Sequence, residues 1–227
     1  MARSVTLNTI DWESVEAILL DMDGTLLDLS FDNHFWNQAV PAFYAEEKGV
    51  SLEFAHQYLK TCYKQHQGTL NWYCTDFWSE TLGIDIIRYK RRLSNKVNLR
   101  PGTRDFLEQV SAAKQKVFMV TNAHPETLRL KLKQTKIESY FDELYSSHQF
   151  KHPKESPLFW ARLEKSIAIP LSRCLFVDDT ESILIRAQES GVKYIAMIDQ
   201  PDMNEPAKEN LSLPSINRLT DLFESIK

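Results

Sequence analysis

The sequence is poor in cysteine, in long apolar runs and in excess positive charge, and each of these absences excludes a class of protein. The three cysteines among 227 residues form no CxxC pair, so we expect neither a disulfide scaffold nor a zinc knuckle. Apolar stretches such as 17–20 and 117–120 are far shorter than the roughly 20 residues that cross a bilayer. The formal net charge is −4, whereas a nucleic-acid-binding protein usually carries a basic face. The sequence thus predicts no membrane anchor and no nucleic-acid partner.

The remaining composition is that of an ordinary globular protein. Hydrophobic residues make up 43% and charged residues 26% of a 26.4 kDa chain, which corresponds to one or two domains with a core that needs no disulfides. Asp11 and Glu13 interrupt the apolar segment that a signal peptide requires, so we expect a cytoplasmic protein. No heptad pattern or exposed apolar strand predicts an obligate dimer, and the sequence favours a monomer.

Strands and helices alternate over most of the chain. Short apolar runs typical of buried strands occupy 17–20, 117–120, 174–177 and 194–198, with a further candidate at 144–146. Helical patterns lie at about 103–114, 125–136, 156–166 and 181–190. This alternation predicts βαβ units and a parallel sheet. The tail from about residue 200 contains three prolines, and we expect it to be mostly loop with a short helix near 219–226.

The segment between the first and second strands has a different character. Residues 31–90 hold 13 of the 25 aromatic residues, and apolar side chains recur there at helical spacing. The expected helices are one around 35–44, one that begins after Ser51 as its N-cap, one from Asn71 to Leu82 that ends at Gly83, and one over about 84–94. We therefore predict an α/β core domain of residues 1–30 and 97–227, interrupted by a helical domain of residues 31–96.

Polar side chains follow three of the predicted strands. They are Asp21 and Asp23 after the first strand, Thr121 and Asn122 after the second, and Asp178 and Asp179 after the third. Lys154 lies in a loop before the helix that leads to the third strand. Because ligands of open α/β sheets bind at the carboxyl ends of the strands, we expect these residues to converge on one crevice.

The expected convergence constrains the chemistry. Four unpaired carboxylates in a cleft would repel one another, and a lysine with a divalent cation would offset that charge. Mg²⁺ suits such an all-oxygen site. Thr121 and Asn122 stand just before a helix that is expected to begin at Pro125, and free amides at a helix start bind phosphate. Together these features indicate phosphoryl transfer.

Asp21 and Asp23 are two residues apart, so their side chains can face the same side at the end of an extended strand. One carboxylate can then attack phosphorus, as aspartate does in aspartyl-phosphate chemistry. The other can give a proton to the leaving oxygen and later activate water. Gly24 lets the backbone turn sharply beside the site.

The motif Asp21-Met22-Asp23-Gly24-Thr25 resembles DxDGT, the first motif of the haloacid dehalogenase (HAD) superfamily. Thr121, Lys154 and the pair Asp178-Asp179 match the second, third and fourth motifs, in order. The resemblance covers almost the whole chain. It implies a HAD-like Rossmannoid parallel-sheet core with an inserted helical cap of the C1 type.

The resemblance also implies a role for each motif residue. Asp21 would be the nucleophile, Asp23 the general acid and base, and Lys154 the bridge between Asp21 and the transferring phosphoryl group. Thr121 and Asn122, with Lys154, would bind substrate, and the Mg²⁺ site would comprise Asp21, Asp23 (through its backbone carbonyl), Asp178 and Asp179. One departure is Glu155, which follows Lys154 where many relatives have proline, and which we expect to loosen that loop slightly.

Segments 27–36, 69–74 and 121–125 resemble HAD 5′-nucleotidases that act on purine monophosphates. This implies a small-molecule substrate such as GMP or IMP, hydrolysed to nucleoside and phosphate. A sugar-phosphate phosphatase, a phosphomutase and a non-catalytic HAD-like binding protein remain alternatives. A dehalogenase is disfavoured because its chemistry does not need Asp23.

Several side chains between the motifs have both a structural and a functional interpretation. We expect the aromatic residues of 31–96 mainly to form a core, although Phe35, Trp72 or Tyr73 can stack on a purine. Asn33 and Asn71 can either cap a helix or loop or bind a purine edge, and His124 can either face the phosphate or have a structural or exposed position. We expect His148 and His152 at the surface, and Cys62 and Cys74 as reduced core thiols.

Overall fold

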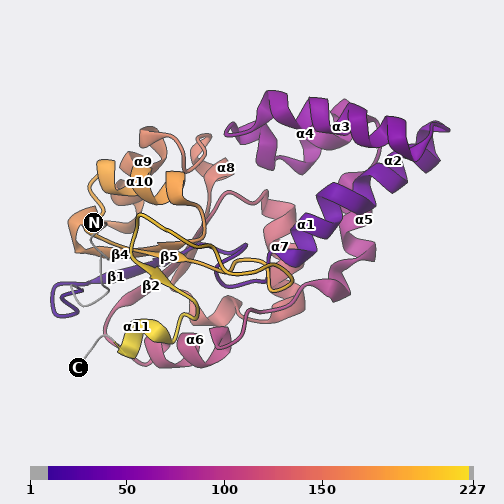
Figure 1. The fold of residues 1–227 in the computed structure, drawn as a ribbon. Coiled ribbons are helices and arrows are strands. Elements are labelled where there is room, and N and C mark those ends of the chain that lie inside the picture. The colour runs from indigo at the N-terminus through magenta and orange to yellow at the C-terminus, as the bar shows by residue number, and fades with distance from the viewer. Residues whose placement is uncertain (1–9, 225–227) are drawn as a thin grey trace.

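The computed structural model of the protein describes residues 10–224, which contain six parallel strands in one sheet of order β3-β2-β1-β4-β5-β6 (Figure 1). The strands are β1 (Ala17–Leu20), β2 (Lys116–Thr121), β3 (Glu143–Ser146), β4 (Cys174–Asp178), β5 (Tyr194–Ile198) and β6 (Ser215–Ile216). The first five confirm the predicted strands and the predicted α/β class. The two-residue strand β6 was not predicted, because the proline-containing tail around it gave no strand pattern.

The register of the central strands brings their carboxyl ends to the same edge. Leu20, the last residue of β1, lies opposite Met119 of β2 and Val177 of β4. The next residue, Asp21, continues this alignment by donating its backbone N–H to the carbonyl of Val177 at 3.0 Å. The chain order changes direction at β1, so the edge beyond these strands is the usual ligand position of a doubly wound sheet.

Helices cover both faces of the sheet. One face carries α6 (Thr103–Ser111), α7 (Pro125–Thr135) and α11 (Asp221–Glu224), and the other carries α8 (Ser147–Phe150), α9 (Pro157–Ile167) and α10 (Glu181–Glu189) (Figure 1). Short 3-10 turns, η4 (Glu138–Tyr140) and η5 (Leu171–Arg173), precede β3 and β4. The predicted helices are confirmed, but α6 ends three residues earlier than expected. The last two residues of the helix predicted near 219–226 lie outside the described residues.

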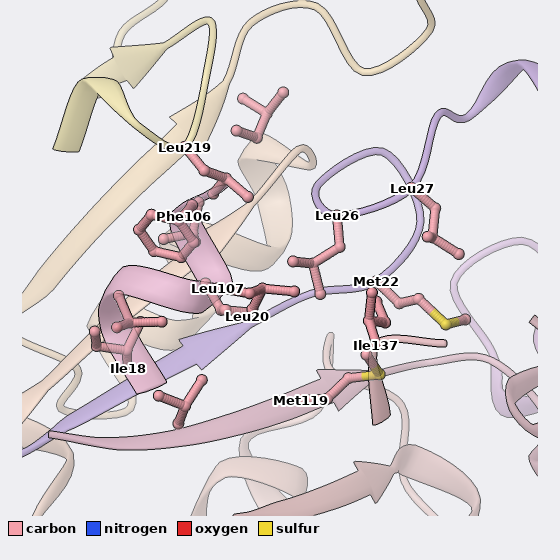
Figure 2. Packing of buried hydrophobic residues seen from close by; sticks show 14 of the residues in the cluster. Ile18, Leu20, Met22, Leu26, Leu27, Phe106, Leu107, Met119, Ile137 and Leu219 are labelled. Carbon is pink, nitrogen blue, oxygen red and sulfur yellow. The ribbon is translucent and has the colours of Figure 1, made fainter. Parts of the chain in front are cut away.

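Each face of the sheet has its own apolar core, because successive side chains of a strand point to opposite faces. Ile18 and Leu20 of β1 pack with Phe106 and Leu107 of α6 and with Leu219 (Figure 2). On the other face, Leu19 of β1 and its β-strand neighbours pack against α9 and α10. The strands are buried on both sides, which explains why they are continuous apolar runs in the sequence.

Residues 30–96, which follow β1, form a helical segment that stands beside the sheet, with α1 and α5 next to α7 (Figure 1). It contains α1 (Ser30–His34), a π-helical turn η1 (Phe35–Ala39), α2 (Val40–Lys48), α3 (Leu52–His66), a 3-10 turn η2 (Leu70–Tyr73), α4 (Thr75–Leu82), α5 (Ile86–Arg92) and a 3-10 turn η3 (Ser94–Lys96). We refer to residues 31–96 as the cap segment. Within residues 10–224, no helix has both the length and the apolar character needed to cross a bilayer.

The starts of two helices in the cap segment were predicted, one correctly and one not. Ser51 is the N-cap of α3, as predicted, and its side chain accepts a hydrogen bond from the backbone N–H of Phe54 at 3.1 Å. The helix that was predicted to begin at Asn71 was placed too early, because α4 begins at Thr75. The Cys74 thiol is the N-cap of that helix and accepts from the N–H of Phe77 at 3.4 Å.

The cap segment has an apolar core of its own. Phe35, Leu59, Trp78 and Ile86 are buried in it, and Tyr89 stacks on Phe43 with ring centroids 3.8 Å apart. This packing agrees with the prediction that most of its aromatic residues are structural. The domain division into 1–30 with 97–227 and 31–96 stays a prediction, which this third apolar core supports.

Candidate active site

A pocket of about 380 Å³ lies between the carboxyl edge of the sheet and the cap segment. All the site residues that the sequence predicted line it: Asp21, Asp23, Thr121, Asn122, Lys154, Asp178 and Asp179. Three strand ends and one loop therefore bring these residues together, as their positions after the strands predicted. A pocket of this size matches sites that hold small molecules.

Three of the carboxylates form a cluster. Asp21, Asp178 and Asp179 each place an oxygen within 4.8 Å of the others, and Asp21 and Asp178 are almost completely buried. Burial raises the pKa of Asp21, and the neighbouring Asp178 and Asp179 raise it further. Burial and Asp178 raise the pKa of Asp179 to about 7. Because the donors are all hard oxygens crowded together, they fit Mg²⁺.

Lys154 lies in the same cluster and offsets part of its negative charge. Its buried Nζ donates to Asp21, to Oδ2 of Asp178 at 2.6 Å and to the carbonyl of Val120 at 3.3 Å. Burial alone lowers the pKa of a lysine, but Asp178 and Asp21 outweigh it and raise the pKa of Lys154. The lysine is therefore a fixed cation beside the Asp21 carboxylate.

Gly24 is required where the chain leaves β1. Its φ is +86°, and a Cβ there would lie 2.7 Å from Cγ of Asp179. Any other residue would be strained and would also push the Asp179 carboxylate away. The sequence-based expectation of a sharp turn beside the site is confirmed.

Asn122 and Thr121 hold the loops of the site in place. Oδ1 of Asn122 accepts from the backbone N–H of Lys154 at 2.9 Å, and its Nδ2 donates to Glu155 at 3.1 Å. The Thr121 hydroxyl, which is buried, accepts from the N–H of Ala123 at 3.0 Å. The Asn122 amide, predicted to bind substrate, lines the pocket but is mainly engaged in positioning the lysine loop.

Asp23 faces the pocket but stands outside the carboxylate cluster. Its Oδ1 accepts a hydrogen bond from Nζ of Lys131 at 2.6 Å. Lys131 is fully buried on α7 and also contacts Asp32 of the cap segment, and Asp32 in turn accepts from Lys90 at 3.0 Å. Two aspartates and two lysines thus form a chain of ion pairs from the core to the cap segment. Burial raises the pKa of Asp23, and Lys131 opposes that rise.

This ion-pair chain was not predicted from the sequence. The signal lay in α7, where the buried residues Thr127, Leu128, Lys131, Leu132 and Thr135 form one face of the helix. A lysine within a buried helical face must be paired with an opposite charge, because an unpaired buried ammonium is too costly. The pattern therefore indicated a buried ion pair, although it did not identify the partner.

Glu155 has a role that its position in the sequence did not predict. Its carboxylate accepts from the Tyr73 hydroxyl at 2.6 Å and from Asn122, so it joins the cap segment to the lysine loop. Burial and the adjacent Glu155 raise the pKa of Tyr73, which keeps its hydroxyl a donor. Glu155 was expected to loosen the loop of Lys154, but in the structure it links that loop to the cap segment.

The cap segment contributes an aromatic wall to the pocket. Trp36, Tyr63 and Trp72 line it, together with Tyr73, whereas Phe35 packs in the core of the cap segment. Asn33 lines the pocket, and its Nδ2 donates to Oδ2 of Asp202 at 2.7 Å. Asn71 is exposed on η2. Of the proposed purine contacts, Trp72 and Tyr73 are therefore better placed than Phe35 or Asn71.

The expectation of a surface position for His148 is wrong. Its ring lies edge-on to that of His124, with centroids 4.9 Å apart, and its Nε2 is shielded from solvent. The contact arises from the packing of α8 beside the start of α7, which the sequence alone did not show. Cys62 and Cys74 are free, half-buried thiols, and Cys62 packs against the core of the cap segment, whereas Cys74 does not.

Comparisons with known proteins agree with this geometry. A family model described as haloacid dehalogenase-like hydrolase matches residues 15–191. The GMP/IMP nucleotidase YrfG of Escherichia coli is 39% identical over 217 residues, which are 96% of this chain and 98% of that protein. The phosphorylated carbohydrates phosphatase of Thermotoga maritima is 21% identical over 191 residues, which are 80% of this chain and 84% of that protein.

A solved structure shares the fold. The crystal structure of a HAD phosphatase from Thermococcus onnurineus has a TM-score of 0.78 at 22% identity and covers 93% of this chain and 98% of its own. The family match spans the first, second, third and fourth motifs, whose residues meet in the pocket. The chain therefore belongs to the haloacid dehalogenase-like hydrolase family and is a hydrolase.

Proposed function

We propose that this hydrolase is a Mg²⁺-dependent phosphatase that cleaves phosphate monoesters of small molecules through an aspartyl-phosphate intermediate. The observation that carries the proposal is the cluster of Asp21, Asp178 and Asp179 around the buried cation of Lys154. Such a site favours an anionic substrate only when a metal ion offsets the carboxylates. Mg²⁺ would be held by Asp21, Asp178, Asp179 and the backbone carbonyl of Asp23. It would stabilise the negative charge of the phosphoryl oxygens.

The protein groups have distinct tasks in this proposal. Asp21 attacks phosphorus and forms the acyl phosphate while the ester bond to the alcohol breaks. Lys154 and the Thr121 hydroxyl stabilise the negative charge of the transferring group. The N–H groups where α7 begins, after Asn122, face an anion favourably because they lack partners within the helix.

Asp23 is the proposed proton donor and acceptor. Lys131 contacts its Oδ1, which leaves Oδ2 for the leaving oxygen of the substrate. Asp23 gives its proton to the departing alkoxide and then takes a proton from the water that attacks phosphorus. Hydrolysis of the acyl phosphate releases inorganic phosphate and restores the Asp21 carboxylate. The raised pKa of Asp23 suits a general acid, because its protonated form is then more populated.

We further propose that the substrate is a purine nucleoside monophosphate such as GMP or IMP. Two observations support this: the 39% identity to the GMP/IMP nucleotidase, and the aromatic wall of Trp36, Tyr63 and Trp72. A purine can stack on an aromatic face, and removing such a face typically costs about 1–3 kcal/mol of binding free energy per base. Residues 31–96 would then be the domain that selects the substrate, above the core of 1–30 and 97–227.

Phosphate release with Mg²⁺ tests the proposal across GMP, IMP, AMP, UMP and glucose phosphates. We expect GMP and IMP to have the highest kcat/KM, and the Asp21→Asn variant to release no phosphate from any of them. A sugar phosphate as the best substrate would favour the second candidate, which the 21% identity to a carbohydrate phosphatase supports. Transfer between sugar hydroxyls without free phosphate would instead indicate a mutase, and absence of turnover at any Mg²⁺ concentration would indicate a binding protein.

A further inference from the structure

Three side chains with nitrogen or sulfur donors meet where the cap segment faces the core. Cys74 caps α4 in the cap segment, His124 precedes α7, and His148 lies in α8. Each places one donor atom within 4.8 Å of the donor atoms of the other two, and all three residues are half-buried. The carboxylate cluster comprises other residues, so this is a second group of potential metal ligands.

Nε2 of His148 is a buried polar atom that lacks a hydrogen-bond partner among residues 10–224. Burial and the neighbouring His124 lower the pKa of His148 to about 4, so the ring is neutral at physiological pH. A hydrogen bond to the Asn122 backbone has the opposite effect on the pKa, as expected when the ring donates to a carbonyl. A neutral imidazole carries one N–H, and since Nε2 has no partner within the described residues, we assign the N–H to Nδ1 and the lone pair to Nε2. A buried acceptor without a hydrogen-bond partner destabilises the folded protein unless something binds it.

His124 is oriented in a way that is typical of metal-binding histidines. Its Nδ1 is 2.9 Å from the buried hydroxyl of Thr75, which fixes the ring. Outer contacts of this kind usually orient a ligating imidazole. The carboxylate of Asp76 lies 3.5 Å from Nε2 of His124, and its negative charge favours a cation at this position.

We propose that Cys74, His124 and His148 bind a borderline-soft divalent cation, for which Zn²⁺ is the model, and so join the cap segment to the core beside the pocket. One thiolate and two imidazoles are a zinc donor set, unlike the all-oxygen set that fits Mg²⁺. Binding converts the Cys74 thiol to a thiolate and releases one proton. In a tetrahedral zinc site, ligand atoms lie about 3.3–3.6 Å apart, so the three groups must approach by up to about 1.5 Å.

The proposal does not depend on the substrate or on catalysis. It makes a spectroscopic prediction, because Co²⁺ in a site with a thiolate shows sulfur-to-cobalt charge-transfer absorption and the carboxylate cluster contains no sulfur. It also predicts a thermal shift, because a ligand that binds only the folded protein raises Tm.

The experiment titrates Co²⁺ into the full-length protein with saturating Mg²⁺, and then adds Zn²⁺. The test variants are Cys74→Ser and His148→Gln, and the matched control is Cys62→Ser, the other half-buried cysteine of the cap segment. Serine is itself a good N-cap, so Cys74→Ser keeps the hydrogen bond that begins α4 while it removes the soft ligand.

We expect the charge-transfer band in the wild type and in Cys62→Ser, with one Co²⁺ bound and displaced by Zn²⁺. The band should be lost in Cys74→Ser, and the affinity should fall at least tenfold in His148→Gln. Zn²⁺ should raise Tm of the wild type and of Cys62→Ser but not of Cys74→Ser. A wild type without the band, a band that persists in Cys74→Ser, or an equal thermal shift in all variants would overturn the proposal.

Discussion

The core and the cap segment position their polar groups in different ways. In the core, Asp21, Thr121 and Asp178 occur where β1, β2 and β4 end, and the parallel register carries them to one edge. In the cap segment, Asp32 and Tyr73 reach the site from helices and turns that are arranged by aromatic packing. The ends of the strands therefore position the polar side chains of the core, whereas the packing of the cap helices positions the side chains around them.

The two regions are joined by polar contacts that neither needs for its own core. Lys131 links Asp23 to Asp32, and Glu155 links Asn122 to Tyr73. These contacts connect the proposed acid and the lysine loop to the segment that would select the substrate. Substitutions on one side of these contacts at a time should therefore separate the contribution of the core from that of the cap segment.

The largest effect is expected on the core side, from Asp21→Asn. The variant lacks the nucleophile, so kcat for any phosphate ester should fall by at least about 10³-fold. Circular dichroism and Tm should show a folded protein, because the amide remains close in shape to the carboxylate. Phosphate release at the wild-type rate from this folded variant would exclude the covalent mechanism.

Lys131→Met tests the link between the regions. The substitution leaves the largely buried carboxylates of Asp23 and Asp32 without their shared cation, although Asp32 keeps Lys90, so the free energy of unfolding should fall by about 3 kcal/mol. Urea denaturation measures it. Lys133→Met, on the exposed side of the same helix, is the control and should change stability by less than about 0.5 kcal/mol. Equal effects of the two substitutions would mean that the buried pairs do not contribute.

Asp32→Asn tests the cap side of that link through pH. Burial raises the pKa of Asp32, but Lys131 and Lys90 outweigh it and lower the pKa to about 2. The unfolded chain, with an ordinary pKa near 3.8, then binds more protons than the folded chain between pH 4 and 2. This contribution to stability, about 2 kcal/mol, is therefore complete above pH 4 and is lost as the pH falls toward 2.

The measurement for Asp32→Asn is the free energy of unfolding by urea at several pH values. The variant should be less stable than the wild type at pH 7, and the difference should shrink between pH 4 and 2. A difference that does not change over that interval would show that the ion pairs of Asp32 do not cause it.

The smallest effect is expected from Tyr73→Phe, which removes the hydroxyl that bonds Glu155. Glu155 keeps its contact with Asn122, so we expect a loss of about 1 kcal/mol, or roughly a fivefold rise in KM for nucleotides. Hydrolysis of a small aryl phosphate should change less, because that substrate does not need the cap segment. Tyr58→Phe, which leaves this link intact, is the control, and an equal rise in KM for both variants would contradict the role of Tyr73.

Most of the core could be predicted because its signals are local. Each buried strand is an apolar run followed directly by its polar residue, so Asp21 and Asp178 were visible without knowledge of the fold. The boundaries of the helices were also close, since Pro125 and Pro157 begin α7 and α9. The start of α4 was misplaced because Leu70–Tyr73, directly before it, forms a 3-10 turn that the apolar spacing did not distinguish from an α-helix.

The sequence by itself determined the α/β architecture and which residues meet at the edge of the sheet, because the strand pattern follows from local hydrophobicity and ligands of such sheets bind at the carboxyl ends of the strands. The tertiary structure alone decided that Asp23 pairs with Lys131, that Glu155 pairs with Tyr73, and that His148 is shielded beside His124. These contacts join side chains distant in sequence across the boundary between helices and sheet. Which side chains meet depends on how whole helices and strands pack, and this cannot be predicted from hydrophobic periodicity.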